Sequence, residues 1–336
     1  MKRAPHQFYL LLAGLALLVT TSCGHDKSDP QFLHKPMRAI YHWKTTLSPT
    51  DAEMDFIEQH QVGRIYIHYF DVVLRDGVVQ PEATLGFDRE NYFTRLLLDS
   101  LEVVPTIYIT TDAMNAIKQE PEYSIISADS IAEIYALKIL TRIKAMNKHN
   151  RVANVHEVQL DCDWTASLAS TYFELLSKLR TFLHQEGMAL SVTIRLHQLK
   201  ESAPPADIGV LMLYNTGNLM AERTRNSILD IEDVKPYLKA VNSYAFPLDF
   251  AFPDFGWQVC FQDGKFVKLA SPSDSTTHQY SVRHEQADIA TIKQVKQLAE
   301  KSLSNSHGKS IIIYHLDEQF LNKFNSDEIE TIYGTR

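Results

Sequence analysis

Strand-like runs alternate with amphipathic segments along most of the chain. A strand shows apolar residues at a two-residue period or as one short apolar run, whereas a helix shows them at i, i+3 and i+4. By these criteria, strands are predicted over about residues 38–43, 64–70, 103–110, 155–165, 189–198, 209–214, 248–252 and 310–315. Helices are predicted over about residues 51–59, 89–98, 127–147, 167–185, 231–238 and 286–303. This alternation is typical of a parallel α/β fold.

The length of the chain decides between two arrangements of such a sheet. Its 336 residues suit one closed barrel of eight strands once an export segment is set aside. No glycine-rich phosphate turn follows an early strand, which disfavours an open nucleotide-binding sheet. We therefore predict a single (β/α)8 TIM-like barrel over residues 38–336, with an inserted β-hairpin at about 257–269 that turns at Asp263-Gly264.

Three local expectations belong to this fold. Proline cannot donate a ladder hydrogen bond, so the third strand is expected to begin at Pro105. Asp76-Gly77 is expected to lie in a loop between the second strand and the next helix. The helix over 127–147 is expected to turn one broad apolar stripe inward, made of Ile131, Ile134, Leu137, Ile139, Leu140 and Ile143.

Composition and charge exclude some classes of protein. A chain with 45% hydrophobic and 22% charged residues is typical of a globular domain with a sizeable core, not of a disordered chain. A net charge of −8, spread over both signs, does not indicate a nucleic-acid-binding surface. We expect no nucleic-acid partner.

The N-terminus has the order of charges of an export signal. Lys2 and Arg3 precede an apolar run over residues 8–19, which is too short to cross a bilayer comfortably. The run ends in Thr20-Thr21-Ser22-Cys23, which resembles a bacterial lipoprotein signal, although Thr20 stands where that pattern prefers Leu. The resemblance implies a signal peptide over residues 1–22, a lipidated Cys23, a polar tether over 23–37, and a membrane anchor in the cell envelope. An ordinary signal with a chance cysteine is the alternative.

The remaining cysteines do not form a disulfide framework. Only Cys162 and Cys260 follow Cys23, and two cysteines are too few to staple so large an exported domain. Cys162 falls on the apolar face of its strand, which favours a buried thiol. A single bridge between Cys162 and Cys260 stays open.

The stretch over 155–165 changes from apolar packing to acids. At a two-residue period one face carries Val158, Leu160 and Cys162, and the other carries Glu157, Gln159, Asp161 and Asp163. The next predicted strand has a polar face of Ser191, Thr193, Arg195 and His197. If the two strands pair in parallel, Asp161 and Asp163 meet Arg195 and His197.

Active sites of (β/α) barrels lie where the strands end, so polar residues at those ends are the candidates. Acids together with aromatic rings suit a sugar, whose hydroxyls bond to carboxylates while its apolar face stacks on a ring. The catalytic candidates are Asp161, Asp163 and Glu318. The candidates for substrate binding are Trp43, Asp71, Arg195, His197, Tyr214, Asn215 and Asp317. No His-Glu-x-x-His or similar ligand spacing occurs, and we predict neither a metal site nor a cofactor.

The run Leu160-Asp161-Cys162-Asp163-Trp164-Thr165 resembles the strand-four motif of chitinase-like glycoside hydrolases of family 18, Asp-x-x-Asp-x-Asp-x-Glu. Asp161 and Asp163 match the second and third acids of that motif. Val158 stands in place of the first acid, and Thr165 in place of the catalytic-acid Glu. The resemblance implies a sugar-handling barrel without carrying over the chitinase mechanism. More broadly, the chain resembles exported lipoproteins with glycosidase-like barrels.

Two functions therefore remain open. The first is a membrane-anchored glycoside hydrolase that uses acids from the fourth and eighth strands. The second is a non-catalytic protein that binds glycan or cell-envelope partners on a degenerate hydrolase scaffold. Thr165 favours the second, while the many acids at strand ends favour the first. A purely structural ion-pair network in the barrel is a further interpretation of the same charges.

Overall fold

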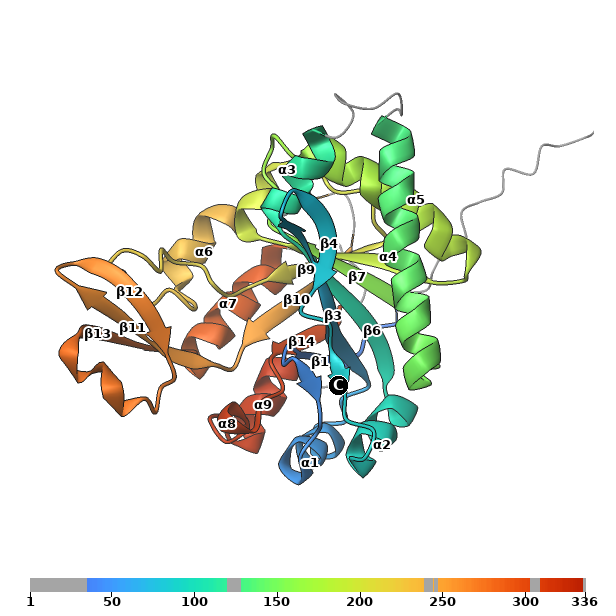
Figure 1. Ribbon diagram of the computed structural model, residues 1–336. Coiled ribbons are helices and arrows are strands. Elements are labelled where there is room, and N and C mark those ends of the chain that lie inside the picture. The colour runs from blue at the N-terminus through green and yellow to red at the C-terminus, as the bar shows by residue number, and fades with distance from the viewer. Residues whose placement is uncertain (1–34, 120–127, 239–243, 245–246, 303–308, 335–336) are drawn as a thin grey trace, which may run out of the picture. The chain divides into compact units, whose positions relative to one another are not determined.

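A closed ring of parallel strands forms the centre of the protein, as the computed structural model shows (Figure 1). The structure describes residues 35–119, 128–238, 244, 247–302 and 309–334. Within these ranges eight strands pair in order, and β1 closes the ring by pairing with both β14 and β3. The ring consists of β1 (Arg38–His42), β3 (Arg64–Arg75), β6 (Glu102–Ile109), β7 (Glu157–Cys162), β8 (Ala189–Ile194), β9 (Ile208–Met212), β10 (Leu248–Pro253) and β14 (Ile311–Tyr314). The predicted barrel is confirmed.

Helices surround the ring and cover its apolar outer face. They are α1 (Asp51–Gln59), α2 (Tyr92–Ser100), α3 (Thr111–Gln119), α4 (Ala128–Asn150), α5 (Ala169–Gln185), α6 (Ile231–Leu238), α7 (Ile289–Ser302), α8 (Glu318–Leu321) and α9 (Ser326–Tyr333). Short pieces complete the chain: β2 (Thr46–Leu47) pairs with β5 (Gly86–Phe87), and η2 (Leu196–Lys200) and η4 (Ser275–Gln279) are 3₁₀-helices. The sequence did not predict α3, which begins directly after β6.

Local sequence sets the ends of several helices. Thr50 caps α1 through a capping box with Glu53, so two free backbone N–H groups find partners. On α5, buried Tyr172, Leu176 and Leu183 recur at helical spacing and pack on the barrel. Gly187 follows α5 with a φ of 75°, a conformation that glycine adopts without strain.

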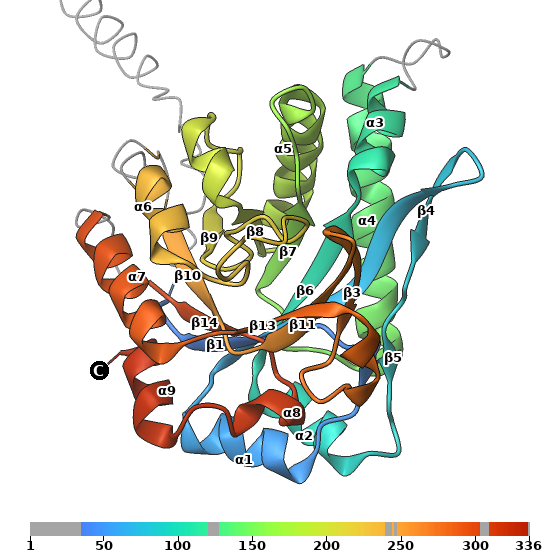
Figure 2. The ribbon, with the colours of Figure 1, turned by 90° about the vertical axis from the view of Figure 1, so that its left-hand side faces the viewer.

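The second strand does not end in a loop as predicted. β3 continues beyond the barrel and turns at Asp76-Gly77, whose φ angles of 52° and 78° suit a tight hairpin. It then pairs in antiparallel fashion with β4 (Val78–Glu82). Figure 2 shows this hairpin reaching past the rest of the barrel. The alternation of apolar and polar residues does not reveal it, because β4 has no buried residue and therefore no clearly buried face.

Pro105 lies within β6 and does not begin it, so this prediction is wrong. Val103 donates its N–H to the Asn154 carbonyl, on the side of β7. Two residues later the missing donor of Pro105 faces the same side, where the ladder to β7 starts only at Thr106. No ladder bond is therefore lost at Pro105.

The predicted stripe of α4 is only partly buried. Ile131, Ile139 and Ile143 are buried, whereas Ile134 and Leu137 are 38% and 44% exposed. Residues 127–130, where this helix is predicted to begin, lie outside those whose side chains are described. The apolar surface of α4 is thus wider than the part that packs against the barrel and α5, and the rest stays exposed.

The inserted element is a sheet of three strands, larger than the predicted hairpin. β11 (Gly256–Gln262) and β12 (Lys265–Ala270) form the predicted hairpin around Asp263-Gly264. β13 (Ser281–Gln286) adds to the other edge of β11. A Cβ atom on Gly256 would lie 2.9 Å from the Glu285 carbonyl oxygen, so glycine permits this close pairing.

Candidate functional site

We call the end of the barrel where the strands begin the lower end, and the end where they finish the upper end or mouth. Polar side chains fill the barrel interior at the lower end. The Tyr66 hydroxyl donates to Glu157 at 3.2 Å, and Arg64 lies 3.0 Å from Glu102 and 3.5 Å from Glu157. Above them, the Tyr41 hydroxyl donates to Gln159 at 2.8 Å. These pairs stabilise polar groups that would be costly to bury alone, whereas the Arg64 Nε and Nη1 atoms are buried without a hydrogen-bond partner among the described residues. The predicted candidates Asp161, Asp163 and Arg195 lie at the upper end, where β7 and β8 end.

Arg195 lies between two aspartates at that upper end. β7 and β8 pair in parallel with Gln159 opposite Ser191, and this register carries Asp161 and Asp163 next to the polar face of β8. The Arg195 Nη2 atom lies 3.4 Å from Asp161 Oδ1, and its Nε donates to Asp163 Oδ1. The predicted charge cluster of these three residues is confirmed.

The two carboxylates have different surroundings. Asp161 is buried and accepts a hydrogen bond of 2.6 Å from the Thr193 hydroxyl. Burial raises the pKa of Asp161, and the Arg195 charge opposes that rise. The side chain of Asp163 is 44% exposed. Although burial opposes it, the two aspartates raise the pKa of Arg195 above its usual value, so the guanidinium stays charged.

A short 3₁₀-helix holds Arg195 in place. β8 ends at Ile194, and η2 begins at Leu196. The buried side chain of Gln198 accepts from the Arg195 backbone N–H at 2.8 Å and donates to the Trp164 carbonyl at 3.1 Å. Gln198 thus ties the end of β8 to the end of β7, a role that the strand-period analysis did not predict.

His197 does not join the cluster. The predicted strand over 189–198 stops four residues early, and His197 lies exposed on η2. The period of two that placed it beside Arg195 no longer applies once the backbone turns into a 3₁₀-helix. Its predicted place on the polar face of the strand is therefore wrong.

Aromatic rings line the upper end beside the charges. Tyr214 stacks on Tyr314 with ring centroids 4.8 Å apart, and Tyr314 lies 5.9 Å from Trp43. Trp43 in turn stacks on His68 at 4.6 Å. Trp43 and Tyr314 are half-buried, so part of each ring is open to solvent. We call Trp43, His68, Tyr214 and Tyr314 the aromatic wall; the sequence predicted Trp43 and Tyr214 but missed the other two.

Two more predicted or neighbouring groups belong to this end. Asp71 bonds to His68 at 2.6 Å and so supports the ring that stacks on Trp43. Burial raises the pKa of the Tyr108 hydroxyl, and the charges of Asp163 and Asp161 raise it further. Tyr108 therefore lies within electrostatic reach of the cluster.

The Tyr214 hydroxyl is buried without a hydrogen-bond partner among the described residues. Its residue is 4% exposed, and burial raises the pKa of the hydroxyl. An unpaired buried hydroxyl costs about 1–3 kcal/mol.

The remaining candidates lie elsewhere. Asn215 is exposed with a φ of 53°. Asp317 caps α8 and lies 3.5 Å from Lys44 and 3.8 Å from His315; the contact with His315 lowers the pKa of Asp317 to about 2. Glu318 is exposed at the start of α8, and its backbone N–H donates to Glu53 at 3.3 Å.

The position after Trp164 is occupied by Thr165, which has no carboxylate. It is exposed, and its hydroxyl shares a 2.9 Å hydrogen bond with Ser167. Trp164 is fully buried on the outside of the barrel, with its ring 5.3 Å from that of Phe173. The end of β7 therefore presents two acids to the mouth and no third one.

One acid with an unusual pKa lies outside the mouth. Asp254 follows β10, and the period of two places it on the outer face with Phe252. It is buried and accepts from the His315 backbone N–H at 2.7 Å. Burial raises its pKa to about 6, while nearby His315 and Lys323 oppose the rise. Its bond to a backbone N–H indicates a role in holding the end of β14.

Other kinds of site find no support in the described ranges. No three His, Cys, Asp or Glu side chains there are grouped so that they could hold a metal ion. No helix there is both long and apolar enough to cross a membrane. Cys162 and Cys260 are both buried and unbridged.

Comparison with solved structures places the barrel among known folds. The spore cortex-lytic enzyme SleL of Bacillus cereus is similar over 89% of this chain and 75% of its own, with a TM-score of 0.56 and 17% identity. A chitinase from Chromobacterium violaceum is similar over 90% of this chain and 100% of its own, with a TM-score of 0.57 and 12% identity. The GH18 chitinase ChiB of Flavobacterium johnsoniae has a TM-score of 0.53 and 13% identity, over 89% and 94% of the two chains.

These similarities establish the fold and stop there, because all the identities are low. No protein-family model matches the sequence. No curated protein matches it as a sequence relative. The chain is thus a TIM barrel of the same architecture as chitinase-like glycoside hydrolases.

Proposed function

We propose that this chain is an exported, membrane-anchored barrel protein that binds a carbohydrate at the upper end of the barrel without hydrolysing it. Export and anchoring rest on the N-terminal charges, the apolar run and Cys23. Carbohydrate binding rests on the aromatic wall beside Asp163 and Arg195, since sugars need both a ring surface and charged hydrogen-bond partners. The fold shared with chitinases adds support.

Arg195 is the observation that favours binding over hydrolysis. Glycoside hydrolysis needs one carboxylic acid that can donate a proton and a second group that stabilises the cation. Here the acid with the raised pKa, Asp161, is buried and already bonded by Thr193, and Asp163 is paired with Arg195. Thr165 offers no replacement acid.

A glycoside hydrolase is the second candidate. The observation that favours it is the pair of acids in unlike environments, Asp161 buried with a raised pKa and Asp163 partly exposed. If this candidate is right, Asp163→Asn abolishes sugar hydrolysis and leaves the melting temperature nearly unchanged.

Binding and hydrolysis can be separated in one set of measurements. A panel of oligosaccharides, including β-1,4-linked N-acetylglucosamine hexamer, is titrated into the protein by calorimetry, and products are analysed after long incubation. Trp43→Ala should weaken binding about tenfold, equal to about 1.4 kcal/mol of lost stacking. Tyr92→Ala is the matched control, because Tyr92 is 72% exposed on α2.

We expect a bound sugar and no new reducing ends. Reducing ends that appear with the natural chain and disappear with Asp163→Asn would replace the binding proposal by the hydrolase. If no sugar of the panel binds, or if Tyr92→Ala weakens binding as much as Trp43→Ala, the mouth of the barrel is not a carbohydrate site.

A further inference from the structure

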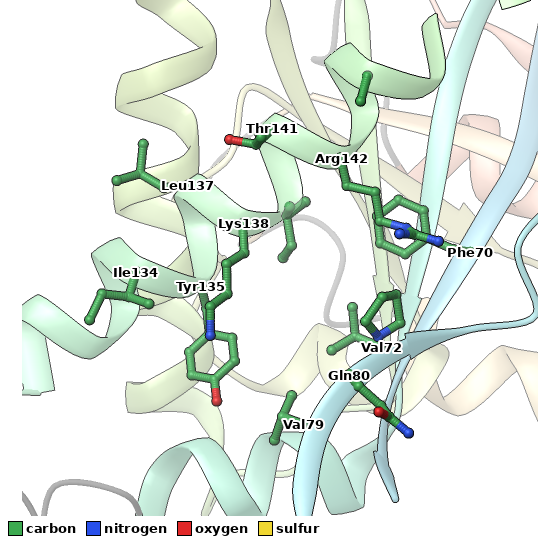
Figure 3. A pocket seen from close by; sticks show the side chains of 13 residues that line it. Phe70, Val72, Val79, Gln80, Ile134, Tyr135, Leu137, Lys138, Thr141 and Arg142 are labelled. Atoms are coloured by element: carbon green, nitrogen blue, oxygen red, sulfur yellow. The ribbon is translucent and has the colours of Figure 1, made fainter. Parts of the chain in front are cut away.

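A groove runs along the outer face of α4, on residues that take no part in the aromatic wall or the charge cluster. Its first part, a cavity of about 640 Å³, lies between α4 and the β3–β4 hairpin (Figure 3). Val72 and Val79 line it from the hairpin, and Ile134 and Leu137 are among the residues that line it from the helix. These helix residues are 38% and 44% exposed, so an apolar surface stays in contact with water.

The groove continues into a basic end. A second cavity of about 490 Å³ shares Arg142 with the first and adds Arg89 and His149. A third, of about 290 Å³, shares Arg89 and His149 with the second and adds Arg95 and Arg151. The shared lining residues place the three cavities side by side, from apolar walls to a set of cations.

Arg89 and Arg142 have neutral hydrogen-bond partners. Arg89 donates to the His149 carbonyl at 3.2 Å and to Asn150 Oδ1 at 2.9 Å. Arg142 donates to the Thr84 hydroxyl, and its Nε atom is buried without a partner among the described residues. Their positive charges are therefore not balanced by those contacts, in a chain whose net charge is −8.

Two cation–π contacts lie in the lining of the first cavity. The Arg142 guanidinium lies 5.0 Å from the Phe70 ring centroid, and the Lys138 ammonium lies 4.7 Å from that of Tyr135. Figure 3 shows Arg142 over Phe70 at one edge of the apolar cavity. Arg95, by contrast, is paired with the carboxylate of Asp99.

We propose that this groove binds a membrane phospholipid with an anionic head group. One acyl chain occupies the apolar first cavity, which Leu137 and Val79 help to line, and the head group pairs with Arg142 and Arg89. A single chain fits a concave apolar channel, whereas an extended peptide would bring backbone polar groups that the apolar walls cannot pair. The cations at the far end complement the phosphate. The site does not depend on the carbohydrate proposal.

The test uses the full chain with Cys23→Ser, which carries no acyl group of its own. It is titrated by calorimetry with dihexanoyl phosphatidylglycerol and, separately, with dihexanoyl phosphatidylcholine, both below their micelle-forming concentrations. The anionic lipid should bind about tenfold more tightly, since its charge meets unbalanced cations. Arg142→Gln and Arg89→Gln should each reduce that preference.

Leu137→Glu should weaken the binding of both lipids about tenfold, because it places a charge against the acyl chain. Leu269→Glu is the control: Leu269 is 40% exposed on β12 and lines none of the three cavities, so its change should leave both affinities unaltered. Circular dichroism checks that each variant is folded. We expect Leu137→Glu to fold because Leu137 is partly exposed.

Three results would overturn the proposal. The first is that the two lipids bind with equal affinity, or that neither binds. The second is that Leu269→Glu weakens lipid binding as much as Leu137→Glu does. The third is that sn-glycerol 3-phosphate alone binds as tightly as the anionic lipid. Ultracentrifugation adds a fourth: a dimer that Leu137→Glu converts to a monomer would assign the groove to a second copy of the chain.

Discussion

Arg195 decides what its two aspartate neighbours can do. It balances Asp161, which is buried, and Asp163, which is partly exposed, so neither acid is a free carboxylate. Breaking a buried pair costs more than breaking an exposed one, because the remaining charge stays desolvated. The same guanidinium therefore stabilises the fold and limits the chemistry of the mouth.

Replacing Arg195 should reveal this stabilising role. We expect Arg195→Met to lower the free energy of unfolding by about 3 kcal/mol, and Asp163→Asn by less than about 1 kcal/mol because its pair is partly screened by water. Urea unfolding measures both. Arg225→Met is the control: Arg225 pairs with Asp230 but is 67% exposed, so its loss should be negligible. Equal losses in the two arginine variants would contradict the prediction.

Asp254 should make stability depend on pH. Folding raises its pKa from 3.8 to about 6, so between these values the folded chain holds a proton that the unfolded chain has released. The contribution of Asp254 to stability therefore falls as pH rises across that interval and stays low above it.

Asp254→Asn should remove this fall while keeping an oxygen that accepts from the His315 N–H. At pH 7 the variant should be more stable than the natural chain by up to about 3 kcal/mol, since each pKa unit corresponds to about 1.4 kcal/mol. Thermal unfolding between pH 4 and pH 7 tests this expectation. Parallel stability profiles for the two chains would show that Asp254 does not titrate in this range.

At the scale of elements, the period of apolar residues placed strands and helices well where both faces meet protein. β7 and the beginning of β8 followed the predicted alternation, so Asp161 and Arg195 could be paired from the sequence. The prediction failed where an element leaves the barrel. The β3–β4 hairpin and the outer arc of α4 are exposed, and exposure removes the packing constraint that makes a pattern readable.

Backbone hydrogen bonding explains the other misses. Pro105 is tolerated inside β6 because its missing donor faces a part of β7 that is not yet paired. His197 does not lie beside Arg195 and the aspartates because the backbone after β8 forms the 3₁₀-helix η2, in which the Gln198 side chain accepts from the Arg195 N–H. Both outcomes depend on partners from distant parts of the chain, which no local window contains.

At the scale of the whole molecule, we predict that the protein is exported and lipidated at Cys23. The N-terminal charges, the short apolar run and Ser22-Cys23 support this, and acyl chains on that cysteine would be enough for a stable anchor. Labelled palmitate should enter the natural chain and not Cys23→Ala. Equal labelling of the two would contradict it.

The sequence by itself determined the barrel, the pairing of β7 with β8, and the charges that meet there, because strand period and parallel pairing are local or nearly local rules. Only the tertiary structure decided that Tyr314 and His68 join Trp43 in one wall, since β1, β3 and β14 become neighbours when the ring closes. It also decided which charges are balanced, because the burial of a charge and its distance from a partner depend on every layer packed around it.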